Sequence, residues 1–301
     1  MFTLMRSALA LLILAAALPA NAAIKVLATT SDWGALVTEV GGDQVNVYVA
    51  TSALQDVHRV EAKPSLVARA RSADLVVASG AELEIGWLPV LIQESGNSRI
   101  QPGSPGYFEA ASVLSLLDKP ARFDRSLGDI HPQGNPHVQL DPHNIARVAK
   151  ALTERLSQLD GAHAQYFQQR EKDFDTRWQA AIQRWEGEAA PLKGKPVVVM
   201  HRDQTYLCQW LGLNQVAAIE PKPGMPPTAG YLGQLVTKLT ASPPRVIMVN
   251  AYNDPKAANW LSDRVHAPTV VLPFSVGGSK EAKDLFGLFD DTLNKLLAVL
   301  K

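Results

Sequence analysis

The amino-acid sequence predicts an α/β fold with two parallel-sheet lobes, a long rigid helix that joins them, and a binding cleft between the lobes. Short runs rich in Val and Ile alternate with amphipathic stretches in the first third of the chain, and the same alternation returns after residue 195. Between them lies a long stretch with helical spacing and no strand pattern. Continuous apolar strands that alternate with helices are typical of parallel sheets covered on both faces.

The first lobe is expected to begin with strands that are each followed by a helix. The expected strands are residues 24–30, 44–50 and 74–80. After the first strand, Ser31 or Asp32 can cap a helix over residues 33–40, and two glycines at positions 41 and 42 end it. The other helices of this lobe are expected at residues 64–73 and 83–96.

The second lobe repeats this order. Its expected strands are residues 195–200, 214–220, 245–250 and 269–273. Its expected helices are residues 203–213, 229–239, 254–265 and 288–300. Ligands of such folds bind outside the carboxyl ends of the strands, so binding residues are expected in the loops that follow them.

The middle of the chain, residues 144–188, is expected to be helical. Asp141 supplies a cap and Pro142 a first-turn proline. Gly161 should break the stretch into a helix that ends near Leu159 and a long one that begins near Ala162. The charged, tryptophan-bearing end of the long helix is too polar for a core helix, so we expect a solvated strut that lies against both lobes.

The first 22 residues have the order of a secretory signal peptide. Arg6 is followed by an apolar run over residues 8–18 and then by small residues that end at Ala22. The run is shorter than the roughly 20 apolar residues that a membrane-spanning helix needs. We therefore expect cleavage after Ala22 and a periplasmic protein. The expected organisation is a signal peptide (1–22), an N-terminal lobe (23–159), a linking helix (160–190) and a C-terminal lobe (191–301).

Charge and cysteine content exclude several classes of protein. Lys+Arg and Asp+Glu both number 29, and no basic run stands out, which argues against nucleic acid as a partner. The single cysteine, Cys208, excludes an internal disulfide and a cysteine-based zinc cluster. It lies in an apolar pattern and is expected to be a buried packing residue.

Three of the seven histidines occupy the loops in which ligands are expected. His58 follows the second strand, His137 lies in a loop rich in Pro and Gly, and His201 directly follows the strand at 195–200. Neutral imidazoles suit Zn²⁺, which binds three nitrogens and a further ligand tetrahedrally. The three side chains are therefore a candidate Zn²⁺ site, although their spacing forms no short motif and solvated loop histidines remain the alternative.

The other four histidines are weaker candidates. His143 is expected to cap a helix at the surface, and His163 and His266 are expected to face solvent. His131 lies six residues before His137 in the same loop and is a candidate for assisting metal capture.

Three segments carry a resemblance to a known family. "QDVHRVEAKPSLVARARSADLVV", "GNPHVQLDPHNIARVAKAL" and "VVVMHRDQTYLCQWLGL" each resemble a metal-binding loop in the substrate-binding proteins of zinc and manganese ABC importers. The resemblance implies Zn²⁺ as the transported ligand, bound by His58, His137 and His201, because a histidine at the third position goes with zinc members. It also implies that the protein is a monomer and not an enzyme. The implied partners are the permease and ATPase subunits of an importer.

The sequence departs from the family at two places. Many members carry an aspartate ligand after the last strand, but the matching residues 271–278 contain no acid. Water, Asp203, Glu61 or Glu220 is then expected in the fourth position. The histidine- and acid-rich loop of many zinc members is also missing, and His131 is the only histidine in the corresponding residues 101–133.

Two other functions stay open at this point. Three imidazoles with an open position also resemble catalytic zinc, so a secreted zinc hydrolase is possible, with Asp203 as its base. We expect Asp203 to be an exposed helix cap instead. A binder of Mn²⁺ or of a chelated metal with a role outside transport is the other alternative, and the proline-rich residues 220–230 have no evident function.

Overall fold

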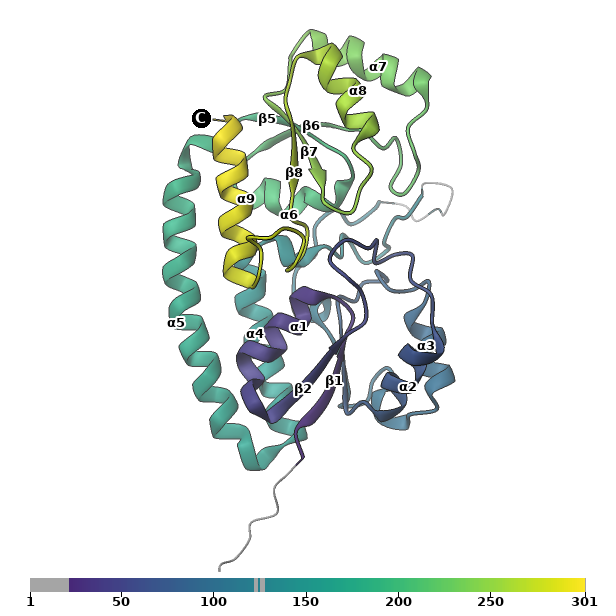
Figure 1. The fold of residues 1–301 in the computed structure, drawn as a ribbon, viewed down its shortest axis with the longest axis vertical. Coiled ribbons are helices and arrows are strands. Elements are labelled where there is room, and N and C mark those ends of the chain that lie inside the picture. Colours follow the sequence, from purple (N-terminus) through teal and green to yellow (C-terminus); the bar gives the residue numbers. More distant parts are fainter. Residues whose placement is uncertain (1–21, 122–123, 125–127, 301) are drawn as a thin grey trace, which may run out of the picture.

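The computed structural model describes residues 22–121, 124 and 128–300, and it confirms the predicted fold class (Figure 1). The expected signal peptide lies, except for Ala22, outside these residues. The first lobe contains a four-stranded parallel sheet in the order β2-β1-β3-β4. Its strands are β1 (Ile24–Ala28), β2 (Val45–Val49), β3 (Leu75–Ala78) and β4 (Tyr107–Glu109). Its helices are α1 (Ser31–Gly41), α2 (Pro64–Ser72), α3 (Leu88–Ser95) and α4 (Pro142–Leu159).

The second lobe has a four-stranded parallel sheet of the same topology, in the order β6-β5-β7-β8. Its strands are β5 (Pro196–Val199), β6 (Asn214–Ala218), β7 (Val246–Asn250) and β8 (Thr269–Leu272). Its helices are α6 (Thr205–Trp210), α7 (Ala229–Thr240), α8 (Lys256–Val265) and α9 (Leu285–Leu300). In each sheet the first strand of the lobe lies between two others, β1 between β2 and β3 and β5 between β6 and β7. The loops that follow these strands leave the same edge of the sheet and meet between the lobes.

Two elements of the first lobe differ from the sequence-based expectation. The strand β4 was not expected, because three residues are too few to show an alternating pattern. The helix expected from residue 83 begins only at Leu88, next to Pro89. The preceding residues form turns in which Ala81 and Glu82 have positive φ angles of 50° and 65°, a conformation that no helix accommodates.

The linking helix α5 (Ala164–Ala189) runs along both lobes (Figure 1). The chain breaks near Gly161, as expected, and α5 packs against α1 and α4 of the first lobe and α9 of the second. The helix lies against both lobes, as expected, but the expectation of a solvated strut was wrong for one face. Five large side chains on that face are buried: Phe167, Phe174, Trp178, Ile182 and Trp185. The charged residues that made the segment look polar occupy the opposite face.

One hydrophobic core runs through both lobes. A continuous cluster of buried side chains begins at Ile24 in β1, includes the apolar face of α5, and ends at Leu300 in α9. Two smaller clusters cover the outer faces of the sheets, under α2 and α3 in the first lobe and under α7 and α8 in the second. The lobes are therefore held together by burial as well as by the chain. None of the described helices is long and apolar enough to span a membrane.

Candidate metal site

The three histidines predicted as ligands lie together between the lobes. The ring centroids of His58 and His137 are 5.3 Å apart, those of His58 and His201 6.0 Å, and those of His137 and His201 5.9 Å. His58 comes from the loop after β2, and His137 comes from the loop before α4. His201 is the second residue after β5. Loops that are distant in sequence meet here because each follows the carboxyl end of a parallel strand or precedes a helix.

A fourth histidine, His131, lies in the same cluster. Its ring centroid is 5.5 Å from that of His58 and 6.3 Å from that of His137. One nitrogen from each of His58, His131 and His137 lies within 4.8 Å of the other two, which is close enough for the three to share a metal ion. The sequence pointed to His131 only as an aid to metal capture. Its place in the cluster depends on a loop path that no local pattern reveals.

Carboxylates orient two of the rings. The Nδ1 atom of His58 lies 2.8 Å from Oδ1 of Asp56, and Nδ1 of His201 lies 2.6 Å from Oε2 of Glu220. A hydrogen bond from Nδ1–H to a carboxylate leaves Nε2 unprotonated and directed away from it, and metal-bound histidines are commonly held in this way. The sequence did not single out Asp56 or Glu220 for this role.

Several ring nitrogens in the cluster are buried without a hydrogen-bond partner. They are Nε2 of His58, Nε2 of His131, and both Nδ1 and Nε2 of His137. Buried polar atoms are nearly always hydrogen-bonded, so orphaned nitrogens that share one space indicate a bound group. A neutral imidazole has one unprotonated nitrogen, so each of the three rings can offer one lone pair to a cation.

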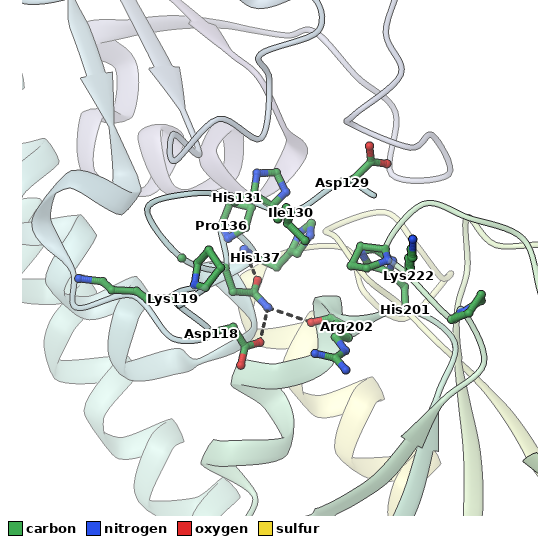
Figure 2. A pocket seen from close by; sticks show the side chains of 15 residues that line it. Asp118, Lys119, Asp129, Ile130, His131, Pro136, His137, His201, Arg202 and Lys222 are labelled. Atoms are coloured by element: carbon green, nitrogen blue, oxygen red, sulfur yellow. Dashed lines mark hydrogen bonds between the residues drawn. The ribbon is translucent and has the colours of Figure 1, made fainter. Parts of the chain in front are cut away.

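The "GNPH" stretch is shaped to hold His137 in place. Gly134 has a φ of 120°, and a Cβ there would lie 2.7 Å from the backbone oxygen of Leu117. The side chain of Asn135 accepts a hydrogen bond from the His137 backbone N–H at 3.1 Å. It donates to Oδ2 of Asp118 at 3.1 Å and to the backbone oxygen of Arg202 at 2.8 Å (Figure 2). Asn135 thus ties the His137 loop to the residue that follows His201 in the other lobe.

The surroundings favour neutral rings at two positions. Burial, reinforced by the neighbouring imidazoles, lowers the pKa of His137 well below its usual value. Burial and the ring of His58 lower the pKa of His131 to about 4. Burial also acts to lower the pKa of His201, but the nearby charges of Asp203 and Glu220 outweigh it and the pKa is raised. Metal ligation requires the neutral form of imidazole, which His131 and His137 already have at neutral pH.

The acidic residues considered as a fourth ligand have other positions. Asp203 is fully buried, which corrects the expectation of an exposed helix cap, and its Oδ2 atom accepts hydrogen bonds from Tyr252 at 2.6 Å and from Asn250. Burial raises the pKa of Asp203 to about 6. Glu220 is engaged with His201, and Glu61 is exposed and lines a separate pocket.

The segment that follows β8 presents an aromatic ring in place of an acid. The ring of Phe274 contacts that of His137 edge-on, with centroids 5.6 Å apart, and also packs against Tyr252. Phe274 is buried, so this side of the cluster is an apolar wall.

A pocket of about 470 Å³ adjoins the cluster (Figure 2). Its lining includes His131, His137 and His201 together with Lys119, Arg202 and Lys222. The proline-rich loop after β6 forms part of the wall and reaches the first lobe.

The contacts of this loop cross between the lobes. The backbone oxygen of Pro223 accepts a hydrogen bond from the Asp129 N–H at 2.9 Å, and that of Gly224 accepts one from the Arg59 guanidinium at 3.2 Å. The loop also carries Glu220, whose Oε2 atom accepts from the Gly224 N–H at 2.8 Å. The proline-rich segment therefore connects the second lobe to the loops that carry His58 and His131.

The remaining histidines lie elsewhere. Asp141, rather than His143, caps α4, and the His143 ring contacts Glu186 of α5 at 2.9 Å. The His163 ring contacts Asp160 at 2.6 Å. His266 is exposed and ends α8 in a left-handed conformation.

Comparison with known proteins gives a consistent result. A family model described as zinc-uptake complex component A, periplasmic, matches residues 26–299. The high-affinity zinc uptake system protein ZnuA of Bacillus subtilis (strain 168) is 24% identical over 248 residues, which cover 81% of this chain and 76% of that protein. The manganese ABC transporter substrate-binding lipoprotein PsaA of Streptococcus anginosus is 20% identical over 270 residues, which cover 87% and 83%.

The solved structures agree with the fold. A crystal structure of ZnuA superimposes with a TM-score of 0.78 at 20% identity, and the match covers 93% of this chain and 100% of that one. Similarity at this level of identity establishes the shared architecture.

Proposed function

Because this chain belongs to the family of periplasmic zinc-uptake components, we propose that it captures Zn²⁺ between its lobes with His58, His137 and His201 and delivers the ion to an ABC importer. The chain is a substrate-binding protein of the zinc and manganese importer type. The choice of Zn²⁺, the ligands and the delivery step are the proposal. The observation that carries it is the convergence of three imidazoles from separate loops, two of which, His58 and His137, have buried ring nitrogens without a hydrogen-bond partner.

The donor set supports Zn²⁺ over Mn²⁺. Imidazole nitrogens suit zinc and its neighbours in the transition series, whereas manganese prefers carboxylate, carbonyl and water oxygens. Of the acidic side chains nearest the cluster, Asp56 and Glu220 contact the far sides of histidine rings, and Asp203 contacts Tyr252 and Asn250. Asp56 and Glu220 are thereby engaged away from the ion, and Oδ1 of Asp203 is the one buried carboxylate oxygen of the three without a hydrogen-bond partner. Imidazole nitrogens therefore dominate the donors, and we favour zinc as the transported ion.

Location and partners follow from the same proposal. Residues 1–22 would direct export and be removed after Ala22, which leaves a periplasmic monomer. Its partners would be the permease and ATPase subunits of a zinc importer, and nucleic acid has no part in the function. The relatives named above are transport proteins rather than enzymes. A zinc hydrolase finds little support, because its candidate base, Asp203, is fully buried and hydrogen-bonded to Tyr252 and Asn250.

Metal titration of the purified protein tests the proposal. After removal of metal with a chelator, the protein should take up one Zn²⁺ per chain in competition with a chromophoric chelator. His58→Ala, His137→Ala and His201→Ala should each abolish tight binding, because each removes a ligand. His163→Ala, which changes a histidine outside the cluster, serves as the matched control and should bind like the wild type. Wild-type affinity in all three cluster variants would refute the site.

A further inference from the structure

We propose that His131 is the fourth ligand, so that the ion is held by four imidazoles. The inference rests on the proposed Zn²⁺ site and completes its coordination. The first support is position, because a nitrogen of His131 lies within 4.8 Å of nitrogens of both His58 and His137. The second is that Nε2 of His131 is buried and has no hydrogen-bond partner. His131 therefore has a buried ring nitrogen without a partner, as His58 and His137 do.

The turn after β3 holds the His131 ring from the other side. A hydrogen bond with the backbone of Ala81 acts to raise the pKa of His131. This direction is expected when a ring N–H donates to the carbonyl oxygen of Ala81. This is the arrangement in which the opposite ring nitrogen is free to bind metal. Three consecutive residues of the turn have positive φ angles: Gly80 at 79°, Ala81 at 50° and Glu82 at 65°. The left-handed conformation of the two non-glycine residues, Ala81 and Glu82, is strained, and strain of this kind is concentrated at binding sites.

Glu84 fixes the strained turn. Its buried carboxylate accepts hydrogen bonds from the backbone N–H groups of Ser79 at 2.8 Å and Gly80 at 3.2 Å, and from the Thr29 hydroxyl at 2.6 Å. Glu84 therefore fixes the turn, and the turn in its place positions the ring of His131. The same logic of an oxygen acceptor behind the ring applies to His58 and His201, which use Asp56 and Glu220.

Most carboxylate oxygens beside these rings, among the described residues, have other partners. Oδ2 of Asp203 accepts hydrogen bonds from Tyr252 and Asn250, whereas its Oδ1 atom is buried without a partner and is the carboxylate alternative to His131. Phe274 occupies the side reached from β8, and the acids beside His58 and His201 accept hydrogen bonds from the far nitrogens of those rings. Four neutral nitrogen donors leave the full positive charge on the ion. Such a set favours Zn²⁺, Co²⁺, Ni²⁺ or Cu²⁺ and disfavours Mn²⁺. The proposal thus predicts a narrower choice of metal than a site that includes a carboxylate.

Three variants test the inference. His131→Gln removes the imidazole, His131→Asp replaces it with an oxygen ligand, and His266→Asn changes an exposed histidine whose left-handed conformation asparagine tolerates. Zn²⁺ and Mn²⁺ affinities are measured by chelator competition. X-ray absorption of the zinc-loaded proteins counts the imidazole ligands, and the visible spectrum of the Co²⁺ form reports changes in the donor set.

The wild type and His266→Asn should show four imidazoles around zinc. His131→Gln should show three, and should weaken Zn²⁺ binding by more than the roughly 10–100-fold that loss of a ligand's hydrogen-bond partner costs. His131→Asp should shift the ratio of affinities toward Mn²⁺ and change the Co²⁺ spectrum. Three imidazoles in the wild type, with unchanged affinity in His131→Gln, would overturn the inference while leaving the three-histidine site intact. Unchanged zinc binding in His58→Ala, His137→Ala and His201→Ala would instead overturn the proposed function.

Discussion

Single residues behind the rings decide how well the cluster is prepared for a metal. His201 lies two residues after β5, and its ring is fixed by Glu220, which lies two residues after the neighbouring strand β6. Glu220 also accepts a hydrogen bond from the Gly224 N–H, so one carboxylate holds both a ligand and the loop that reaches the other lobe. The position of Glu220 therefore affects binding although it need not touch the ion.

Substitution of Glu220 tests this role. Glu220→Gln removes the charge that favours an Nδ1–H tautomer in His201, and we expect Zn²⁺ affinity to fall by roughly 10–100-fold with the stoichiometry unchanged. Titration against a chromophoric chelator measures the change. Glu61→Gln, an exposed acid in a separate pocket, is the control and should bind like the wild type. The reverse ranking of the two variants would show that Glu61 is the acid that matters.

A fully buried acid, Asp32, connects the lobes. It lies in the first turn of α1, and its Oδ1 atom accepts a hydrogen bond from the Val276 N–H at 2.9 Å in the segment after β8. Burial raises the pKa of Asp32 to about 6. Because the folded state then holds a proton that the unfolded chain releases near pH 4, raising the pH from about 4 to about 6 lowers the free energy of unfolding.

Asp32→Asn should remove this pH dependence. The amide keeps an acceptor for the Val276 N–H and cannot ionise, so the variant should gain stability relative to the wild type as the pH rises through that window. The gain is at most on the order of 3 kcal/mol, from a shift of about two pKa units. Urea unfolding of the metal-free proteins at pH 4.5, 5.5 and 7 measures the difference. Parallel curves for the two proteins would contradict the assignment.

The sequence predicted some of these residues and missed others for a physical reason. His58, His137 and His201 follow strands or precede a helix, so local patterns are enough to place them near the cleft. The burial of Asp203 could not be predicted, because its partners Tyr252 and Asn250 come from β7 and the turn after it. Contacts between distant segments leave no periodic signal in the sequence.

At the scale of elements, α5 was likewise predictable from the sequence only in part. Its helical spacing and the break at Gly161 were predictable from local sequence. Its buried face was not, because charged residues dominate the composition of the segment. Trp178 stacks on Phe174 with centroids 5.2 Å apart and meets Phe286 of α9 edge-on at 4.8 Å. The Trp178 indole also donates to the backbone oxygen of Pro142 at 2.8 Å, at the start of α4.

Trp178→Ala should therefore destabilise the whole protein. Truncation of a fully buried tryptophan leaves a cavity and is expected to cost about 3–5 kcal/mol in the free energy of unfolding. Urea unfolding of the metal-free protein measures it. Gln183→Ala, on the exposed face of the same helix, should change stability by no more than about 0.5 kcal/mol. Similar losses in both variants would mean that helix propensity, rather than packing, sets the contribution of α5.

At the scale of the whole molecule, the shared core predicts that the lobes unfold together. Buried side chains from both sheets belong to one cluster that passes through α4, α5 and α9. Calorimetry should show a single transition, and Zn²⁺ at about 1,000 times its dissociation constant should add about 4 kcal/mol of stability. His201→Ala should lose most of the shift in melting temperature produced by that concentration of Zn²⁺. Two separate transitions, with only one responding to Zn²⁺, would show that the lobes are energetically independent.

The same core should also limit how far the lobes move when metal binds. The helix α5 is 26 residues long and packs on α1 and α4 at one end and on α9 at the other, so a wide hinge opening would expose buried aromatic side chains. The histidine rings already lie within 6.3 Å of their neighbours in the structure. We expect a backbone change of about 1 Å or less on binding, as in other preorganised sites. Small-angle X-ray scattering of the chelator-stripped and zinc-loaded protein should then give radii of gyration that agree within error. A decrease of several ångströms in the radius of gyration would mean that the metal-free protein opens despite the packing of α5. Part of the free energy of metal binding would then be used to close the lobes.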